Sequence, residues 1–533
     1  MEDFLNDWGI TAAVFLPLVG ALLIMVIPRR EEAAHKWVAL LTSLVVAAIG
    51  VMMIIEFDME LPASDGKFQF VQDRSWIDAI NARYHVGIDG ISLPLILLTM
   101  LVVPLCVIYS WNHFPEPHNP KAFLALIMIL ETGMIGSFVA LDLVLFFVFF
   151  EVVLLPMFFM IAVWGGEDRR YASLKFFLYT LFGSALMLLS FLALYFLSDP
   201  HTFDMTELPA AAQGIALGTQ VWIFLGMFMG FGIKVPMFPF HTWLPDAHTQ
   251  APTVGSVILA AVLLKLGTYG FVRVAIPILP AAAVKVAPLI GILAVIGIIY
   301  GALGCLAQTD MKRLIAFSSV AHMGFVMLGI STLTQFGINA AVFGMVAHGL
   351  ITGMLFFIAG SVKERYHTLE ISRISGLLVD APKMGWIFGF CAMASLGLPG
   401  LAGFWGEFPA ILSSYSPANG LSEELWRVLM VVAALGTVFA AGYLLWLLQR
   451  TAFGTPKPAE DGHHEHIHDI HVSEGIAWAP LLVLIVALGI FPNIVFKPLD
   501  HAVGVQLSQH ECLVADEGPD CADLADQQTA QGN

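Results

Sequence analysis

Ionisable side chains stand in the middle of long apolar runs of this 533-residue sequence, where a charge is expensive. A charged residue at the centre of a membrane helix costs about 2.5 to 3.5 kcal/mol even on a lenient insertion scale. Such positions are occupied by five acids and bases and two histidines: Glu131, Glu151, Lys234, Lys265, Glu407, His322 and His348. A structural pair that locks two helices explains any single one of them. So many in one chain predict an ion path.

Three further ionisable residues, and Glu131 among those above, need separate treatment. Lys175 and Arg273 lie near the ends of apolar runs, so both are predicted to extend their charges to the membrane interface. Lys175 is kept as a candidate member of the path. Asp142 lies in a tight connection and is predicted to cap a helix. Glu131 fits a place on the path and a structural pair equally well.

Helix-breaking residues accompany two of these charges. Around Lys234 the chain reads GIKVPMFP, and a proline removes a helix hydrogen bond and clashes with the preceding turn. Glu407 lies in the breaker-rich run GLPGLAGFWGEFP, whose apolar stretch is longer than one membrane span. Interrupted helices at membrane depth line protein or wet cavities and mark ion sites in transporters. The seventh and twelfth spans are therefore predicted to be discontinuous.

The apolar runs predict an all-α polytopic membrane protein with about fourteen transmembrane helices. Lipid offers no partner for open backbone, and the runs are too long for barrel strands. With bounds good to a few residues, the predicted spans are 9–27, 37–55, 91–109, 123–140, 143–163, 172–196, 222–240, 253–276, 286–307, 314–330, 340–362, 384–415, 426–448 and 478–495.

Composition excludes several classes of protein. With 58% hydrophobic and 12% charged residues, the chain is no soluble globule. A net charge of -17 argues against a nucleic-acid partner, which needs a concentrated basic face. The five cysteines lack iron–sulfur or zinc spacing, and no dinucleotide or P-loop motif is present. We therefore expect no cofactor and no metal in this chain. The acidic N-terminus predicts a retained first span rather than a signal peptide.

An internal repeat is predicted from the spacing of the ionisable residues. Three positions on spans five to seven recur on spans ten to twelve: Glu151 with His322, Lys175 with His348, and Lys234 with Glu407. Because the shift is five spans, the two units are predicted to be inverted five-helix repeats. Lys265 has no ionisable counterpart near position 438, which places it towards the middle of the path. The predicted parts are residues 1–122 (helices 1–3), 123–276 (helices 4–8), 286–448 (helices 9–13) and 449–533 (loop, helix 14 and tail).

The basic residues predict the orientation of the chain. The connections after odd-numbered spans carry fourteen Lys and Arg residues, and those after even-numbered spans carry six. Basic connections stay on the inner side of a membrane, so both termini are predicted on the outer, positive side.

Two soluble segments have unusual compositions. The last connection carries His463, His464, His466, His468 and His471, for which a solvated loop is favoured over a metal site. The acidic tail beyond Gly504 is predicted to be disordered, with a Cys512–Cys521 disulfide and two free thiols equally open. The run from His241 to His248 predicts a structured turn, near a proton entrance, rather than a metal site.

Three motifs carry a family resemblance. They are FEVVLLP at 150–156, the run from Gly232 through HTWLPDAHTQAP to Gly267, and DMKRLIAFSS at 310–319. In these residues the chain resembles the antiporter-like membrane chains of respiratory complex I, and among them subunit M, the equivalent of mitochondrial chain four. The resemblance covers essentially all the predicted spans. The L-type chains continue into a long lateral helix, so a chain that stops soon after span fourteen favours the M type.

The resemblance implies a role for each central residue. In the family, the span-five glutamate pairs with the span-seven lysine, a span-eight lysine continues a hydrated axis, and a span-twelve glutamate ends it. These roles fall on Glu151, Lys234, Lys265 and Glu407, with His322 and His348 as intermediates. It implies a proton-translocating subunit of NADH:quinone oxidoreductase in the cell inner membrane, beside chains resembling subunits L and N. NADH, FMN, iron–sulfur clusters and quinone are expected in partner chains.

Two other functions are open at this point. A multi-chain cation/proton antiporter belongs to the same superfamily and would use similar residues. Its genes would lie beside small antiporter chains rather than dehydrogenase chains. A non-conducting scaffold would use its buried charges only as helix locks, and neutralising Lys265 would then lower assembly rather than transport.

Overall fold

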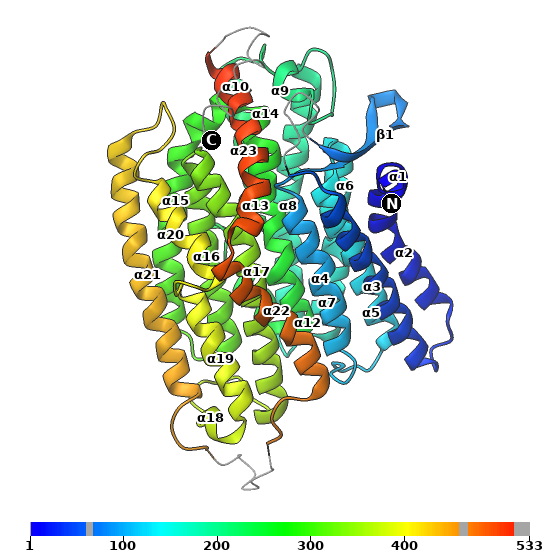
Figure 1. The fold of residues 1–533 in the computed structure, drawn as a ribbon, viewed down its shortest axis with the longest axis vertical. Coiled ribbons are helices and arrows are strands. Elements are labelled where there is room, and N and C mark those ends of the chain that lie inside the picture. The colour runs from blue at the N-terminus through cyan, green and yellow to red at the C-terminus, as the bar shows by residue number, and fades with distance from the viewer. Residues whose placement is uncertain (1, 60–67, 458–466, 516–533) are drawn as a thin grey trace.

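Long helices run along a common direction in this chain and form one bundle, with a β-hairpin at one end (Figure 1). The computed structural model describes residues 2–59, 68–457 and 467–515, and for 508–515 the backbone alone. Helix α1 and the C-terminal end of α23 lie towards the same, upper end in Figure 1, and α18 lies at the lower end.

The N-terminal part consists of the first helices and the hairpin. Its elements are α1 (Glu2–Phe4), the π-helical turn η1 (Leu5–Gly9), α2 (Ile10–Val26), α3 (Glu32–Glu56), β1 (Gln69–Ile77), the 3-10 turn η3 (Asp78–Ile80), β2 (Ala82–Ile88) and α4 (Leu93–Tyr109). The two strands pair antiparallel, with irregular register near both ends. The sequence did not predict this hairpin, because its polar strands carry no hydropathy signal.

The middle part contains several short or interrupted helices. They are α5 (Pro120–Val139), α6 (Leu143–Val152), α7 (Leu154–Trp164), α8 (Arg169–Leu197), α9 (Leu208–Ala211), α10 (Leu217–Lys234), α11 (Trp243–Gln250), α12 (Thr253–Ile258), the π-helical turn η4 (Leu259–Leu263), α13 (Leu264–Gly270), the π-helical turn η5 (Phe271–Ala275) and α14 (Ile276–Ile278). The step from α6 to α7 fits Pro156, which cannot donate the backbone hydrogen bond of a regular helix. Asp142 caps α6 as predicted, accepting from Val144 and Leu145.

The C-terminal part contains the longest helices. They are α15 (Pro280–Leu306), α16 (Met311–Ser331), α17 (Gln335–Tyr366), α18 (Leu377–Asp380), α19 (Pro382–Ser395), α20 (Ala402–Ser413), α21 (Glu423–Thr451), α22 (Val472–Ile490) and α23 (Asn493–Ala515). Helix α23 continues past Gly504, so the prediction of disorder from that residue onwards is wrong as far as Ala515. Cys512 and Cys521, like His463, His464 and His466, fall outside the residues whose side chains are described.

The multi-pass helical character predicted from hydropathy is confirmed. Within the described residues, 12 helices are long and apolar enough to cross a membrane. The shorter α4 and the pair α19 and α20 occupy the stretches predicted as the third and twelfth spans. The total of fourteen spans, the inverted repeat and the four predicted parts stay predictions.

Both predicted helix interruptions occur. Helix α10 ends at Lys234, and α11 begins at Trp243, whose indole nitrogen donates to the Ile233 carbonyl at 2.9 Å. The second interruption separates α19 from α20, where Gly397 and Gly400 have φ of +80° and +93°. These values lie in the left-handed region that glycine enters freely. Pro409 lies inside α20, so this break precedes Glu407 rather than following it.

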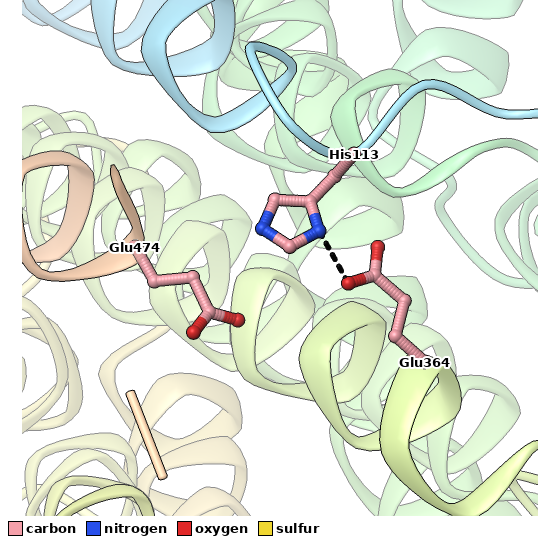
Figure 2. Close-up of side chains that lie close together, drawn as sticks. All are labelled: His113, Glu364 and Glu474. Atoms are coloured by element: carbon pink, nitrogen blue, oxygen red, sulfur yellow. Dashed lines mark ion pairs between the residues drawn. The ribbon is translucent and has the colours of Figure 1, made fainter. Parts of the chain in front are cut away.

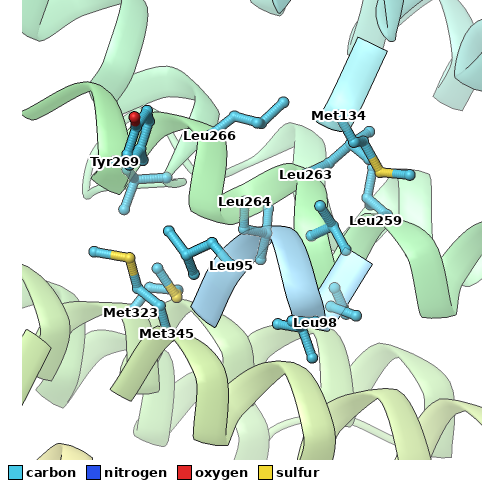
Figure 3. Close-up of a cluster of buried hydrophobic side chains, with 14 of the residues drawn as sticks. Leu95, Leu98, Met134, Leu259, Leu263, Leu264, Leu266, Tyr269, Met323 and Met345 are labelled. Atoms are coloured by element: carbon cyan, nitrogen blue, oxygen red, sulfur yellow. The ribbon is translucent and has the colours of Figure 1, made fainter. Parts of the chain in front are cut away.

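The centre of the bundle is built by helices α4, α5, α13, α16 and α17 around the π-helical turn η4. Leucine and methionine side chains from them interlock, as Figure 3 shows: Leu95, Leu98, Met134, Leu259, Leu263, Leu264, Leu266, Met323 and Met345. The most apolar 18-residue stretch of the span Thr253–Ile278 is entirely buried, whereas α3, α8 and α21 expose many large apolar side chains. Polar side chains on the inner helices are therefore shielded from lipid.

The hairpin is fastened to the bundle by a buried ion pair. His85 Nδ1 lies 2.7 Å from Asp204 Oδ2, and the Leu141 amide donates to the His85 carbonyl. Burial would lower the pKa of His85, but the hydrogen bond and charge of Asp204 raise it above 6.5. Burial would raise the pKa of Asp204, but hydrogen bonds from His85 and Thr206 hold it below 3.8. Both partners are therefore charged in mildly acidic solution.

We expect this pair to stabilise the chain most between about pH 4 and 6.5. The raised pKa of His85 gives a contribution that is complete below about 6.5 and fades as the pH rises through the folded value. The lowered pKa of Asp204 gives one that fades as the pH falls below about 4. Thermal unfolding of the detergent-solubilised chain should show the Tm loss from His85→Gln largest at pH 5 to 6. His201→Gln, which changes an exposed histidine, is the control; a pH-independent loss for His85→Gln contradicts the assignment.

Candidate functional site

Lys234 ends the first half of the interrupted span and is buried. Its ammonium nitrogen lies 4.8 Å from the centre of the Phe150 ring, which fits a cation–π contact. Glu151, which follows Phe150 in the sequence, interacts electrostatically with Lys234. In the described part of the chain no ion pair within 4.0 Å joins the two charges. Glu151 and Lys234 are thus neighbours that attract one another across a gap.

Lys265 lies on α13, directly after the π-helical turn η4. Its ammonium nitrogen donates to the Ala260 carbonyl at 2.5 Å and lies 2.7 Å from His348 Nδ1. A π-helical turn widens the helix and is often found at functional sites. Lys265 is fully buried, so these two contacts take the place of water around its charge.

His322 connects three elements at the other end of the group. Its Nδ1 lies 2.5 Å from Glu407 Oε1, and its Nε2 lies 3.0 Å from the Tyr443 hydroxyl and 3.2 Å from the Ser395 hydroxyl. The His322 and His348 rings are edge to face, with centres 6.0 Å apart. The structure therefore brings together Lys265, His348, His322 and Glu407 from α13, α17, α16 and α20.

A small cavity opens between the two histidines and Glu407. It has a volume of about 20 Å³ and is also lined by Thr352 and Ser395. A space of this size has room for about one ordered water. A water in this cavity would give His348 Nε2 a hydrogen-bond partner, which it lacks among the described residues.

No side chain among the described residues bridges the space between the Glu151 and Lys234 pair and the group that begins at Lys265. Among the described residues no hydrogen bond joins Lys234 to Lys265, although their helices pack closely. Gly267 makes this possible: a Cβ there would lie 2.6 Å from the Phe231 carbonyl oxygen of α10. The backbone contact holds the two lysine-bearing segments at a fixed spacing.

Three other predicted residues lie apart from this chain of contacts. Lys175 pairs with Asp246 at 2.7 Å and retains some exposure. Glu131 is fully buried, and neither of its carboxylate oxygens has a hydrogen-bond partner in the described structure. The prediction for Arg273 is wrong: it is buried in an ion pair with Asp89 instead of reaching the interface. The prediction considered only how near Arg273 lies to the end of its span. Its partner Asp89 is 184 positions away in the sequence, so the sequence did not reveal the pair.

Sequence reasoning missed several polar side chains of the site. Tyr443 and Ser395 gave no signal, because single hydroxyl residues are common in membrane helices. His248 was assigned to a structured turn. It is fully buried, its ring stacks on Phe356 at 4.4 Å, and neither ring nitrogen has a partner in the part of the chain described. Its electrostatic neighbours are Lys312 and Lys265, so the motif that holds it does point towards the centre.

The arrangement suits proton transfer. An amine, two imidazoles and a carboxylate follow one another, and each both accepts and releases a proton. Histidine exchanges protons near neutral pH, which makes it an efficient relay. Among the described residues only His113, Glu364 and Glu474, at the lower end of the bundle, group as metal ligands.

Comparison with known proteins gives consistent results. The family model described as NADH:quinone oxidoreductase/Mrp antiporter, TM, matches residues 140–439, and that for NADH-ubiquinone oxidoreductase chain 4, amino terminus, matches residues 15–137. NADH-quinone oxidoreductase subunit M of Rickettsia conorii is 41% identical over 93% of this chain and 97% of its own length.

Solved structures show the same fold. A chain of respiratory complex I from Thermus thermophilus with bound NADH superposes with a TM-score of 0.81 and 29% identity, covering 93% of this chain and 99% of that one. A chain of the Mrp complex from Dietzia sp. has a TM-score of 0.79 at 18% identity, covering 94% and 97%. The second likeness concerns the fold alone.

Replacing Gly267 by alanine should push the two lysine-bearing helices apart, because the new methyl group meets the Phe231 carbonyl. We expect a destabilisation of about 1 to 3 kcal/mol, the usual cost of overpacking. The Tm of the purified chain measures it. Gly442→Ala is the matched control, since nothing lies within 4 Å of a Cβ there. Equal Tm values for the two variants would show that the close contact is not needed.

Proposed function

The chain belongs to the NADH-quinone oxidoreductase subunit M family, and from this premise we propose that its buried acids, lysines and histidines carry protons across the membrane. It is a multi-pass, antiporter-like membrane subunit of that oxidoreductase complex. The observation that carries the proposal is the series of polar side chains from Lys265 through His348 and His322 to Glu407, which is joined by hydrogen bonds except between the two histidine rings, whose centres lie 6.0 Å apart. A set of separate helix locks would not need to be contiguous.

The first step of the proposed mechanism is a switch at Glu151 and Lys234. A free lysine holds its proton until about three pH units above neutrality, a preference of about 4 kcal/mol. Two unit charges about 4 Å apart attract by about 4 kcal/mol at an effective dielectric constant near 20. Closing or opening the distance between the two residues therefore changes the free energy of the Lys234 proton by enough to hold or release it.

The second step passes the proton along the buried series. A proton released near Lys234 crosses to Lys265 through water, since no side chain spans that interval among the described residues. Lys265 hands a proton to His348, a water entering the cavity carries it to His322, and His322 passes it to Glu407. Redox work in partner chains moves the charge pair and sets the direction. His248, which interacts electrostatically with Lys312 and Lys265, is the proposed connection to the lower surface.

The proposed role makes this chain a catalytic part of the complex for proton transfer, though not for electron transfer. NADH, FMN, iron–sulfur clusters and quinone belong to partner chains in this proposal. Its membrane neighbours are chains resembling subunits L and N, and lipid covers the outer helices, which expose many large apolar side chains.

Cation/proton exchange is the second candidate, because the family model that matches residues 140–439 also describes Mrp antiporters. Sodium prefers a cage of oxygen ligands, whereas the polar series here is built from nitrogen-bearing side chains except at Glu407. Proton transfer is therefore favoured. Uptake of radioactive sodium by vesicles that contain the complex, coupled to NADH oxidation, would instead support exchange.

Replacing Lys265 or Lys234 by alanine should slow proton transfer through this chain by about 10²- to 10⁴-fold, the effect of losing an acid–base group. In reconstituted complexes, the ratio of protons translocated to electrons transferred should fall by the whole share of this chain. Lys285→Ala is the control, since Lys285 is exposed on α15. A fully assembled Lys234→Ala complex with an unchanged ratio would refute the assignment. Reduced assembly of the Lys265→Ala complex, with an unchanged ratio in the complexes that do assemble, would support the scaffold.

We expect both termini on the periplasmic side of the cell inner membrane. An alkaline phosphatase domain fused after Asn533 should therefore be active, and one fused after Lys457, in the preceding connection, should be inactive. The physical reason is that translocating basic connections is unfavourable. Fluorescent protein fusions at the same two positions should give the reverse pattern. If the activities are exchanged, the chain lies in the membrane the other way.

A further inference from the structure

A compact group of potential metal ligands lies at the lower end of the bundle, away from the polar series of the centre (Figure 2). His113 follows α4, Glu364 lies near the end of α17, and Glu474 lies in the first turn of α22. One ligand atom from each lies within 4.8 Å of the others. Three segments far apart in the sequence thus present an imidazole and two carboxylates to one small space.

His113 is the residue that most needs a ligand. Its side chain is only 8% exposed, and its Nδ1 forms an ion pair with Glu364. Its Nε2 is buried and has no hydrogen-bond partner in the described structure. Burying a polar atom without a partner is costly and uncommon. Figure 2 shows the ring between the two carboxylates, and the Tyr109 ring stacks on it at 4.7 Å.

Further histidines stand beside this group. The His471 ring centre lies 6.1 Å from that of His113, and the His468 ring centre lies 6.4 Å from that of His471. Both belong to the histidine-rich connection of the sequence, whose earlier members lie outside the described residues. The chain therefore delivers imidazoles to the place where a buried histidine is unsatisfied.

Glu474 accepts hydrogen bonds from Arg365, from the Ser361 hydroxyl and from the His471 backbone amide, so binding a metal ion would replace one of these contacts. Arg365 donates to both of its oxygens, at 2.9 and 2.6 Å. The same guanidinium also donates to the carbonyls of Ser361, His468 and Asp469. Arg365 therefore remains anchored if one Glu474 oxygen turns to another cation.

We propose that His113, Glu364 and Glu474 bind a divalent transition metal ion of the Zn²⁺ class, with His471 as the fourth ligand. Imidazole together with carboxylate suits zinc and its first-row neighbours, whereas magnesium and calcium prefer oxygen ligands alone. The bound ion ties the ends of α4 and α17 to the start of α22. This site is independent of the proposed proton path.

The test uses the full-length chain purified in detergent and incubated with Zn²⁺. We expect bound zinc with nitrogen ligands at about 2.0 to 2.1 Å in X-ray absorption spectra. His113→Gln should weaken zinc binding by at least about tenfold, since losing a residue that only hydrogen-bonds to a metal ligand already costs about this much. Glu364→Gln, at a partly exposed position, should do the same and guards against misfolding of the first variant.

Two controls separate this site from other histidines. His118→Gln changes an exposed histidine of the same connection, which pairs with Glu32, and should leave zinc binding unchanged. The triple variant His463→Gln, His464→Gln and His466→Gln should also keep the site. Wild-type affinity in folded His113→Gln and Glu364→Gln, or loss of zinc in the triple variant alone, overturns the proposal.

Discussion

The cost of holding charge away from water governs this structure. Lys265 has no solvent, so it survives as a buried base only because the Ala260 carbonyl and the His348 ring take the place of water. His348 in turn lies beside His322 and the cavity that Glu407 also lines. The buried ionisable groups therefore lie one beside the next. The same requirement that makes the interior stable makes it a series of groups able to exchange protons.

Irregular backbone lets an otherwise regular helix bundle meet this requirement. The interruption after Lys234 and the π-helical turn before Lys265 both free backbone carbonyls and shift side chains from their helical positions. Gly397 and Gly400 allow the chain to turn before Glu407. Ion pairs away from the centre, such as that between Arg273 and Asp89, fix the surrounding helices. The helices that these ion pairs fix hold the irregular segments in position.

Much of the fold follows from local properties of the sequence. Hydropathy over about 20 residues locates membrane helices, and proline and glycine mark where they are interrupted. The interruptions around Lys234 and Glu407 were predicted for this reason. The β-hairpin and the length of α23 were not, because polar strands and a weakly apolar helix resemble loops in composition. Neither carries a periodic signal that distinguishes it from solvent-exposed chain.

By itself, the sequence determined which residues are exceptional, since a charge in an apolar run is costly wherever the run packs. Tertiary structure alone decided their partners. His322 meets Glu407 across 85 positions, and Arg273 meets Asp89 across 184. No local rule measures such distances, because helix packing sets them. For the same reason the sequence grouped Glu131 with the other buried charges. Only the folded chain showed that its carboxylate forms no hydrogen bond with them in the described structure.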